Sequence, residues 1–235
     1  YKDVLGFPSD AFEKEYGNPF PKHNRIVCVM PKTTTKYTKR SEEQFSQIAN
    51  SCAEITNKAD RCSIIFFPSY SIMNIVREHF MGITNKTVFA EKQKLTKEEK
   101  EEFLLNFKSY KEKGAVLLAV SSGSFGEGID LPGILSCIVV AGLPLQKPDL
   151  EIKQLIKYYD RKFGNGWDYG YVLPAITKCM QNAGRCIRSE TDRGVIVFLD
   201  ERYAWPQYFR CFPKEWGVEI NKDTGKITEE FFRRQ

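Results

Sequence analysis

The sequence predicts an α/β domain in which helices cover both faces of a mostly parallel sheet. Three continuous apolar runs have the length of a strand and no polar alternation: residues 62–67, 115–120 and 194–199. Strands buried on both faces of a parallel sheet have this pattern. Amphipathic helical patterns separate the runs, as expected where crossover helices connect parallel strands. No shift in composition marks an internal boundary, so residues 1–235 are predicted to form one domain.

The amino-terminal half begins with an irregular segment. Residues 1–25 are rich in proline, phenylalanine and glycine, and we expect a lead-in that lies across the domain. Segment 31–40 carries four basic residues and is interpreted either as a mobile loop or as a phosphate contact. Ser41 has the character of an N-cap. The expected elements are strand 25–30, helix 41–55, strand 62–67, a helix from residue 72, strand 87–90 and helix 92–113.

The carboxyl-terminal half contains a glycine-rich loop after one of the buried runs. The tail from Tyr203 onward is aromatic and charged, and we expect residues 203–235 to pack back on the domain. The expected elements are strand 115–120, loop 121–130, strand 135–140, helix 149–163, helix 171–188 and strand 194–199.

Composition limits the classes of protein that need to be considered. Hydrophobic residues make up 42% and charged residues 28% of the 235, as in an ordinary globular protein. The net charge of +5 permits a polyanionic partner without requiring one. No apolar run approaches a membrane span, so no membrane partner is expected. Seven scattered cysteines without a Cys-x-x-Cys pair indicate reduced thiols and no metal site.

The pattern that organises the chain is Gln-x-x-Gly-Arg-x-x-Arg at residues 181–188. Arg185 and Arg188 share one face if the segment is helical. Guanidinium groups suit phosphate because they stay charged and present a fork of donors, and Gly184 lets another surface approach closely. An isolated Arg-x-x-Arg would most simply be a solvated surface pair.

The longer pattern resembles motif VI of superfamily 2 helicases. Residues 126–133, Gly-Glu-Gly-Ile-Asp-Leu-Pro-Gly, resemble motif V of the iron–sulfur helicase group that contains XPD and its bacterial relative DinG. Residues 67–70 stand in the position of motif IV, and residues 194–203 resemble the XPD form of the strand after motif VI. A lone Gly-x-Gly loop could equally be a tight connection, but the three motifs occur in the family's order. An archaeal member of the XPD branch is the expected source, with a DinG-like protein as the nearest alternative.

This resemblance implies a RecA-like second motor domain and a role for each matching residue. Arg185 and Arg188 would act as arginine fingers on ATP. The other nucleotide-binding residues would be Gln181, Gly184, Glu127, Gly128 and Asp130. The residues expected to contact single-stranded DNA are Ser69, Tyr70, Ser122, Ser124, Trp167 and Arg202. Two have alternatives, since Trp167 would also fit the core, and Arg202 would also fit a surface ion pair with Glu201 or Asp200.

Three family features are missing from the sequence. There is no Gly-x-x-x-x-Gly-Lys-[Ser/Thr], no Asp-Glu-x-His box and no four-cysteine cluster. The family carries all three in its first motor domain, and the chain begins with tyrosine rather than methionine, so we expect a fragment that does not hydrolyse ATP alone. ATP and Mg²⁺ would bind at the interface with the first domain, and a 4Fe-4S cluster would lie in the parent protein.

The resemblance also implies partners and a biological role. The expected partners are single-stranded DNA, the first motor domain of the same polypeptide, and repair factors. XPD implies 5′ to 3′ translocation in nucleotide excision repair, whereas a DinG-like helicase would act outside it. A non-catalytic DNA- or protein-binding module that keeps the RecA-like shell is the alternative from another class. The expected location is the cytoplasm of an archaeon or bacterium, or the nucleus of a eukaryote.

Overall fold

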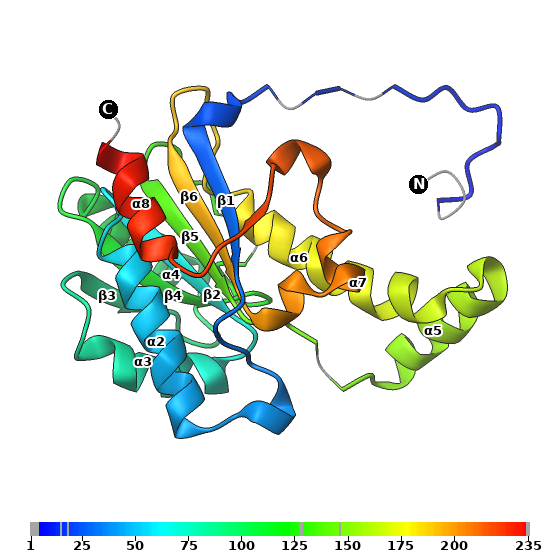
Figure 1. The fold of residues 1–235 in the computed structure, drawn as a ribbon, viewed down its shortest axis with the longest axis horizontal. Helices are drawn as coiled ribbons and strands as arrows, with labels where there is room; N and C mark the ends of the chain where they lie inside the picture. Colours follow the sequence, from blue (N-terminus) through cyan, green and yellow to red (C-terminus); the bar gives the residue numbers. More distant parts are fainter. Residues whose placement is uncertain (1–4, 15, 18, 127–128, 146, 234–235) are drawn as a thin grey trace.

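The computed structural model of the chain describes residues 5–14, 16–17, 19–126, 129–145 and 147–233. Seven strands in these ranges form one sheet in the order β3-β4-β2-β5-β6-β1-β7, and every pairing is parallel (Figure 1). The strands are β1 (Arg25–Met30), β2 (Cys62–Phe67), β3 (Thr87–Ala90), β4 (Ala115–Val120), β5 (Leu135–Ala141), β6 (Gly194–Leu199) and β7 (Glu219–Ile220). The predicted α/β fold class is confirmed.

One face of the sheet is covered by three helices. These are α2 (Glu42–Thr56), α3 (Tyr70–Met81) and α8 (Thr224–Arg233). Their apolar side chains, among them Ile48, Val76 and Phe231, pack against alternate residues of the strands. Ser41 caps α2 by accepting a hydrogen bond from the backbone N–H of Gln44, as its sequence position predicts.

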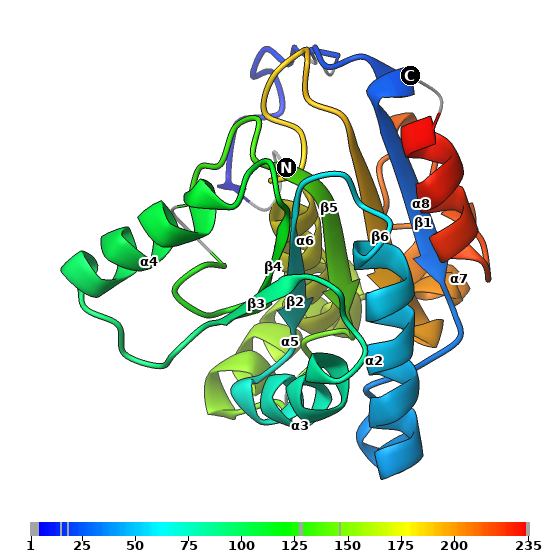
Figure 2. The same cartoon turned by 90° about the vertical axis from the view of Figure 1, so that its left-hand side faces the viewer.

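The opposite face carries α4 (Lys97–Ser109), α6 (Leu173–Ala183) and the short α7 (Pro206–Phe209) (Figure 2). A capping box between Thr96 and Glu99 begins α4, so this helix is shorter than the predicted 92–113. Helix α5 (Leu150–Phe163) is capped by Asp149 and lies away from the sheet. The 3-10 segments are η1 (Lys22–Asn24), η2 (Tyr37–Lys39), η4 (Glu201–Ala204) and η5 (Lys214–Trp216), and η3 (Asp168–Val172) is a π-helix.

The carboxyl-terminal tail packs against the domain, whereas the amino-terminal lead-in does not. The tail packs back through Trp205, Phe209 and Trp216, which lie against the core on the α6 face. It also contributes β7 and α8, which were not predicted as separate elements. The lead-in does not lie across the domain, because its described residues before Phe20 are mostly exposed and run away from the body of the molecule (Figure 1).

The predicted helix 171–188 is corrected at both ends. A π-helix replaces its first turn, and α6 ends at Ala183. Beyond Gly184, the N–H groups of Arg188 and Ser189 donate to the Asp192 carboxylate instead of to helical carbonyls. The two arginines therefore lie on a loop and do not share a helical face. No described helix combines the length and the hydropathy needed to cross a bilayer.

Candidate functional site

The carboxyl ends of the central strands meet in register at one edge of the sheet. Phe67 of β2 pairs with Val120 of β4, and Leu199 of β6 pairs with Met30 of β1 and Ala141 of β5. Ligands of open parallel sheets bind outside this edge. The loops that follow these strands carry most of the residues predicted to contact DNA.

A cavity of about 770 Å³ opens at this edge, and two of the predicted residues, Ser69 and Arg202, line it. The other lining residues are Thr35, Tyr37, Arg40, Pro68, Ile72, Leu143, Pro144, Leu145 and Lys147. The cavity therefore presents hydroxyl and cationic groups together. This combination suits the phosphates of a nucleic-acid backbone.

Arg202 is held inside the domain by a buried carboxylate. Its Nε donates to Asp200 Oδ1 at 2.8 Å, and its Nη2 donates to Asp200 Oδ2 at 2.7 Å and to Thr35 Oγ1 at 2.8 Å. Only 7% of Arg202 is exposed. The predicted ion pair with Asp200 is present, but it is buried rather than at the surface. The phosphate contact stays a prediction, since Arg202 also lines the cavity.

Asp200 also fixes the polar segment that follows β1. It accepts hydrogen bonds from Thr34 Oγ1 at 3.1 Å and from the Thr35 backbone N–H at 2.8 Å. Thr34 and Thr35 are buried, and Arg40 Nε donates to the Thr35 carbonyl at 3.0 Å. The interpretation of this segment as a mobile loop is wrong at these residues. Arg40 is thereby placed at the cavity.

The residues of the motif IV position begin α3. Ser69 is the N-cap and accepts a hydrogen bond from the Ile72 N–H at 3.3 Å. Tyr70 is half-buried, and its hydroxyl donates to Glu91 Oε1 at 2.9 Å. Burial, together with this hydrogen bond, raises the pKa of Tyr70 to about 12. Tyr70 thus remains a neutral donor at physiological pH.

The two predicted serines of the loop after β4 lie in different environments. Ser122 is exposed, whereas Ser124 is half-buried and its backbone N–H donates to Glu91 Oε1. The N–H of Gly123, between them, donates to the Val120 carbonyl at 2.9 Å. Of the two hydroxyls, that of Ser122 is the more accessible to a ligand.

Arg185 clamps the glycine-rich loop from the inside. Its Nη2 donates to the Gly126 carbonyl at 2.6 Å and its Nη1 to the Ile129 carbonyl at 2.7 Å. Arg185 is 8% exposed. Its guanidinium is thus directed at backbone carbonyls of its own domain, whereas the predicted finger role requires a guanidinium at the surface.

Arg188, in contrast to Arg185, presents its side chain to solvent. Its side chain is 42% exposed, and its Nε lies 3.8 Å from Oδ1 of the exposed Asp130. The backbone beneath it is fixed by the buried Asp192, whose Oδ2 accepts from the N–H groups of Arg188 and Ser189 at 2.8 Å. The same carboxylate accepts from the Gly133 N–H through Oδ1 at 3.0 Å. An exposed guanidinium thus stands on an immobilised loop.

The remaining predicted nucleotide residues divide between the surface and the undescribed part of the loop. Gln181 is exposed near the end of α6, and Gly184 follows the helix as its C-cap with ordinary right-handed dihedrals. Asp130 lies beside Arg188. Glu127 and Gly128 lie outside the described residues.

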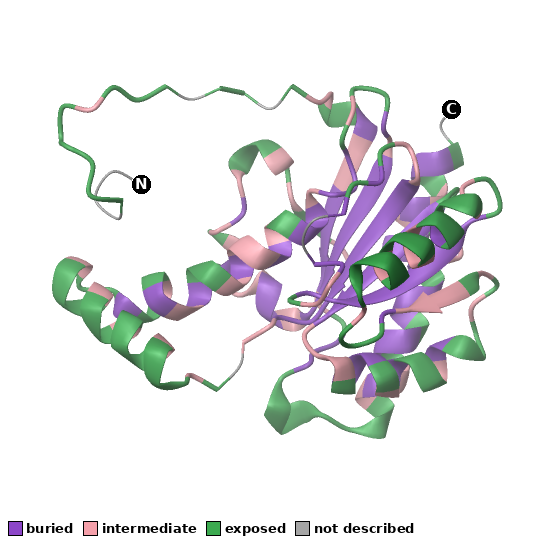
Figure 3. Ribbon diagram, turned by 180° about the vertical axis from the view of Figure 1, so that it is seen from behind, coloured by how far each residue is buried: buried purple, intermediate pink, exposed green. Residues whose placement is uncertain are grey.

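Trp167 lies on a helical arm that α5 and η3 form away from the sheet (Figure 3). Two glycines allow the arm's segments to touch, since a Cβ at Gly166 would lie 2.0 Å from the Ile156 carbonyl oxygen and one at Gly170 would lie 2.8 Å from the Ile156 nitrogen. Trp167 is 52% exposed, with its ring centroid 4.6 Å from that of Tyr171. The alternative that Trp167 is a core residue is wrong.

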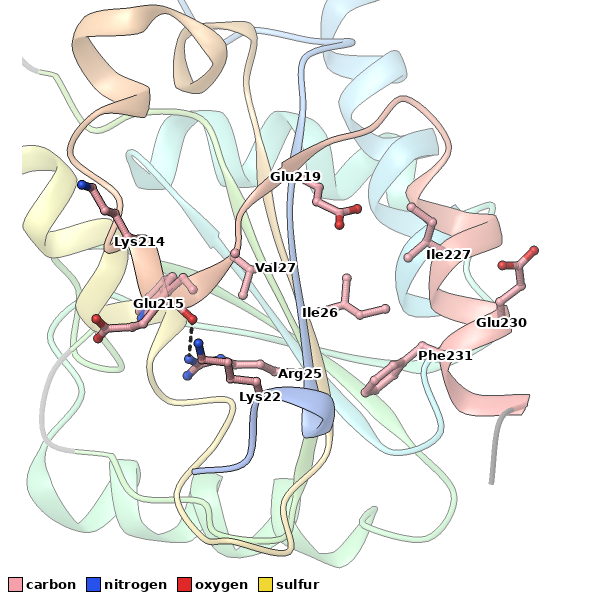
Figure 4. Close-up of a pocket in the computed structure, with 12 residues that line it drawn as sticks. Lys22, Arg25, Ile26, Val27, Lys214, Glu215, Glu219, Ile227, Glu230 and Phe231 are labelled. Atoms are coloured by element: carbon pink, nitrogen blue, oxygen red, sulfur yellow. Dashed lines mark hydrogen bonds between the residues drawn. The ribbon is translucent and has the colours of Figure 1, made fainter. Parts of the chain in front are cut away.

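A separate cavity of about 410 Å³ lies beside β1, between η5 and α8 (Figure 4). Its wall carries both signs of charge, including Lys22, Arg25 and Glu230. Arg25 Nη2 donates to the Glu215 carbonyl at 3.3 Å across this region. None of the described residues predicted for the site lines this cavity.

The cysteines are free and mostly inaccessible. Six of the seven are buried, and Cys211 is half-buried. Burial raises the pKa of Cys28, Cys137 and Cys179 to about 12. No group of three or more histidine, cysteine, aspartate or glutamate side chains among the described residues is arranged to hold a metal ion.

Three buried carboxylates organise the site, and the sequence indicated only Asp200 among them, as a possible surface partner of Arg202. Glu91 directly follows β3, Asp200 directly follows β6, and Asp192 stands two residues before β6. All three are 5% exposed or less. An acidic residue adjoining a buried apolar strand is the signal that could have identified them, because a buried carboxylate requires several donors.

Comparison with protein families matches one family model to this chain. The model described as the helicase C-terminal domain covers residues 52–219, which include both arginines, the glycine-rich loop and the motif IV position.

Curated relatives match most of the chain at modest identity. The DinG protein of Staphylococcus saprophyticus, named a 3′-5′ exonuclease, is 29% identical over 196 residues, which are 80% of this chain and 20% of that protein. The ATP-dependent DNA helicase chl-1 of Caenorhabditis elegans is 28% identical over 189 residues, with 77% and 22% covered. The ATP-dependent DNA helicase DinG of Photobacterium profundum is 26% identical over 196 residues, with 81% and 27% covered. The chain thus spans about a fifth to a quarter of these relatives.

Solved structures show the same fold. An XPD helicase superposes with a TM-score of 0.65 and 23% identity, covering 84% of this chain and 35% of that one. XPD in its apo form gives a TM-score of 0.64 at 22% identity, covering 84% and 40%. The parallel sheet with helices on both faces is therefore the RecA-like fold of these neighbours.

Proposed function

Because the chain belongs to the family of helicase C-terminal domains, we propose that it is the second motor domain of an ATP-dependent DNA helicase of the XPD and DinG type. The first motor domain of the same polypeptide would bind ATP and Mg²⁺. This chain would complete the catalytic site from the other side of the cleft. A 4Fe-4S cluster, if the parent protein has one, would lie outside this chain.

The observation that carries the proposal is the placement of Arg188. Its guanidinium is exposed, its backbone is held by the buried Asp192, and its neighbour Asp130 is also exposed. An arginine supplied from a second domain stabilises the charge that spreads over the γ-phosphate during transfer, and raises turnover about 10³–10⁵-fold. In this proposal Arg188 is the finger, whereas Arg185 fixes the glycine-rich loop beside it.

The cavity at the carboxyl edge would hold the DNA backbone. Arg40, Lys147 and the hydroxyl of Ser69 line it, and the exposed Ser122 follows the neighbouring strand. Contacts to phosphate do not depend on base sequence and weaken with salt. Trp167, which is exposed on the arm, offers a ring on which one base would stack.

Polarity and pathway rest on the resemblance alone. Likeness to XPD favours 5′ to 3′ movement and a role in nucleotide excision repair. Similarity to the DinG proteins favours a second candidate, a helicase that acts outside excision repair. Unwinding of partial duplexes that carry either a 5′ or a 3′ single-stranded tail tests the 5′ to 3′ direction of movement.

The test uses the complete polypeptide and its DNA-stimulated ATPase. Arg188→Ala should lower kcat about a thousandfold with single-stranded DNA affinity retained, because the finger acts on the phosphate. Arg233→Ala is the matched control, since Arg233 is an exposed arginine on α8 across the sheet. Unchanged turnover in Arg188→Ala would rule out the finger role, whereas a wild-type polypeptide without DNA-stimulated ATPase would support the non-catalytic binding module.

A further inference from the structure

We infer that Glu91 is a positioning residue that sets the DNA-contacting ends of β2 and β4 relative to each other, an assignment that rests on the proposed function. Glu91 follows the edge strand β3, and its backbone N–H extends the ladder by donating to the Leu118 carbonyl at 2.9 Å. Its side chain turns into the protein and is 3% exposed. A carboxylate in such a place is stable only where several donors meet it.

Three donors from three segments converge on this carboxylate. The Val120 N–H at the end of β4 donates to Oε2 at 2.8 Å. The Ser124 N–H in the following loop and the Tyr70 hydroxyl at the start of α3 both donate to Oε1, the latter at 2.9 Å. One side chain therefore joins the motif IV position to the beginning of the glycine-rich loop.

The serines predicted to contact DNA stand directly beside these donors. Ser122 lies between Val120, the last residue of β4, and Ser124 of the following loop, whose N–H groups both donate to Glu91. Ser69, which lines the cavity at the carboxyl edge, precedes Tyr70. In this inference, Glu91 sets the spacing between Ser69 and Ser122 although its own carboxylate is buried.

The fit between the carboxylate and the loop leaves no spare room. A Cβ at Gly123 would lie 2.3 Å from Glu91 Oε1, so any side chain at this position must displace the carboxylate. A carboxylate only accepts hydrogen bonds, whereas glutamine replaces one acceptor oxygen with an NH₂ donor. Glu91→Gln keeps the size of the side chain, but its NH₂ group would face one of the groups that donate to Glu91, and that hydrogen bond would be lost.

The far end of the same loop is held by another carboxylate. Asp192 accepts from the Gly133 N–H at 3.0 Å and from the Arg188 N–H at 2.8 Å. Glu91 thus serves the end beside the predicted DNA contacts, and Asp192 serves the end beside Arg188. The two carboxylates should therefore have separable effects, on DNA affinity and on turnover respectively.

The experiment compares Glu91→Gln and Asp192→Asn in the complete polypeptide. Affinity for a fluorescent oligothymidylate is measured without nucleotide, and ATPase is measured against both DNA and ATP concentration. Glu91→Gln should raise the DNA Kd, and the DNA concentration for half-maximal stimulation, about tenfold, the loss expected for one hydrogen bond to a charged group. Its kcat at saturating DNA and its KM for ATP should match wild type. Asp192→Asn should show the reverse, with lower kcat and nearly unchanged DNA Kd.

A further variant keeps the inference testable if Glu91→Gln does not fold. Gly123→Ala pushes a methyl group against the carboxylate. It should weaken DNA binding at unchanged kcat. Wild-type DNA affinity in folded variants would overturn the inference, as would parallel losses of DNA affinity, kcat and thermal stability. A wild-type polypeptide without DNA-stimulated ATPase would instead overturn the proposed function, and the nucleotide-free Kd values would still report on Glu91.

Discussion

Replacing Arg185 with alanine should destabilise the fold, because the residue serves the loop rather than the surface. The guanidinium donates to the Gly126 and Ile129 carbonyls at 2.6 and 2.7 Å, and both residues are buried. A buried acceptor that loses its donor costs about 1–3 kcal/mol, so the two losses together amount to about 2–6 kcal/mol. Relaxation of the loop toward water would bring the result to the lower part of that range.

The assay is urea unfolding of the chain followed by circular dichroism. Arg185→Ala should lower the free energy of unfolding by about 2–4 kcal/mol, and Arg185→Lys should recover part of the loss, because one ammonium group lacks the guanidinium fork. Arg188→Ala is the matched control, since its exposed contact with Asp130 at 3.8 Å is worth about 0–1 kcal/mol. Equal losses in Arg185→Ala and Arg188→Ala would refute the clamp.

Three other predictions concern the arm, the thiols and the buried ion pair. Trp167→Ala in the complete polypeptide should weaken single-stranded DNA binding by about 1–3 kcal/mol in a fluorescence titration; because Trp167 is exposed, a loss of stability without a loss of affinity would contradict the stacking role. Iodoacetamide at pH 8 should label Cys211 alone in the native chain, whereas mass spectrometry should find all seven cysteines labelled in urea. Raising the pH to about 9 should not add label to the other six native thiols, because burial raises the pKa of thiols such as Cys179 to about 12. Arg202→Ala should cost about 3–5 kcal/mol by leaving Asp200 buried and unpaired, and a loss below about 1 kcal/mol in thermal unfolding would show that the pair is dispensable.

The strands were predictable because each is determined by its own residues. The runs at β2, β4 and β6 are almost entirely apolar, with Ser63 in β2 as the polar exception, and parallel strands buried on both faces have this composition. Helix starts were predictable where a cap lies in the sequence, as at Ser41 and Asp149. The short β7 was not predicted, because a strand of two residues has no periodic pattern.

The placement of the site residues depended on partners that local sequence does not reveal. Arg185 and Arg188 look equivalent in the motif, yet one meets the backbone of a loop some sixty residues earlier and the other meets solvent. Beyond the end of α6, Asp192 accepts hydrogen bonds from the Arg188 and Ser189 N–H groups, which a longer helix would have used. Trp167 is exposed because the arm packs on itself through Gly166 and Gly170 rather than on the sheet. Each outcome was decided by tertiary contacts that propensity cannot rank.

The most direct test of the central claim is a structure of the complete polypeptide with single-stranded DNA and ADP–beryllium fluoride, a mimic of ATP. We predict that the Arg188 guanidinium lies about 3 Å from the fluoride atoms that stand in for the γ-phosphate oxygens, whereas Arg185 remains on the Gly126 and Ile129 carbonyls. Arg188 left in solvent across a closed cleft, or Arg185 turned onto the nucleotide in its place, would contradict the account.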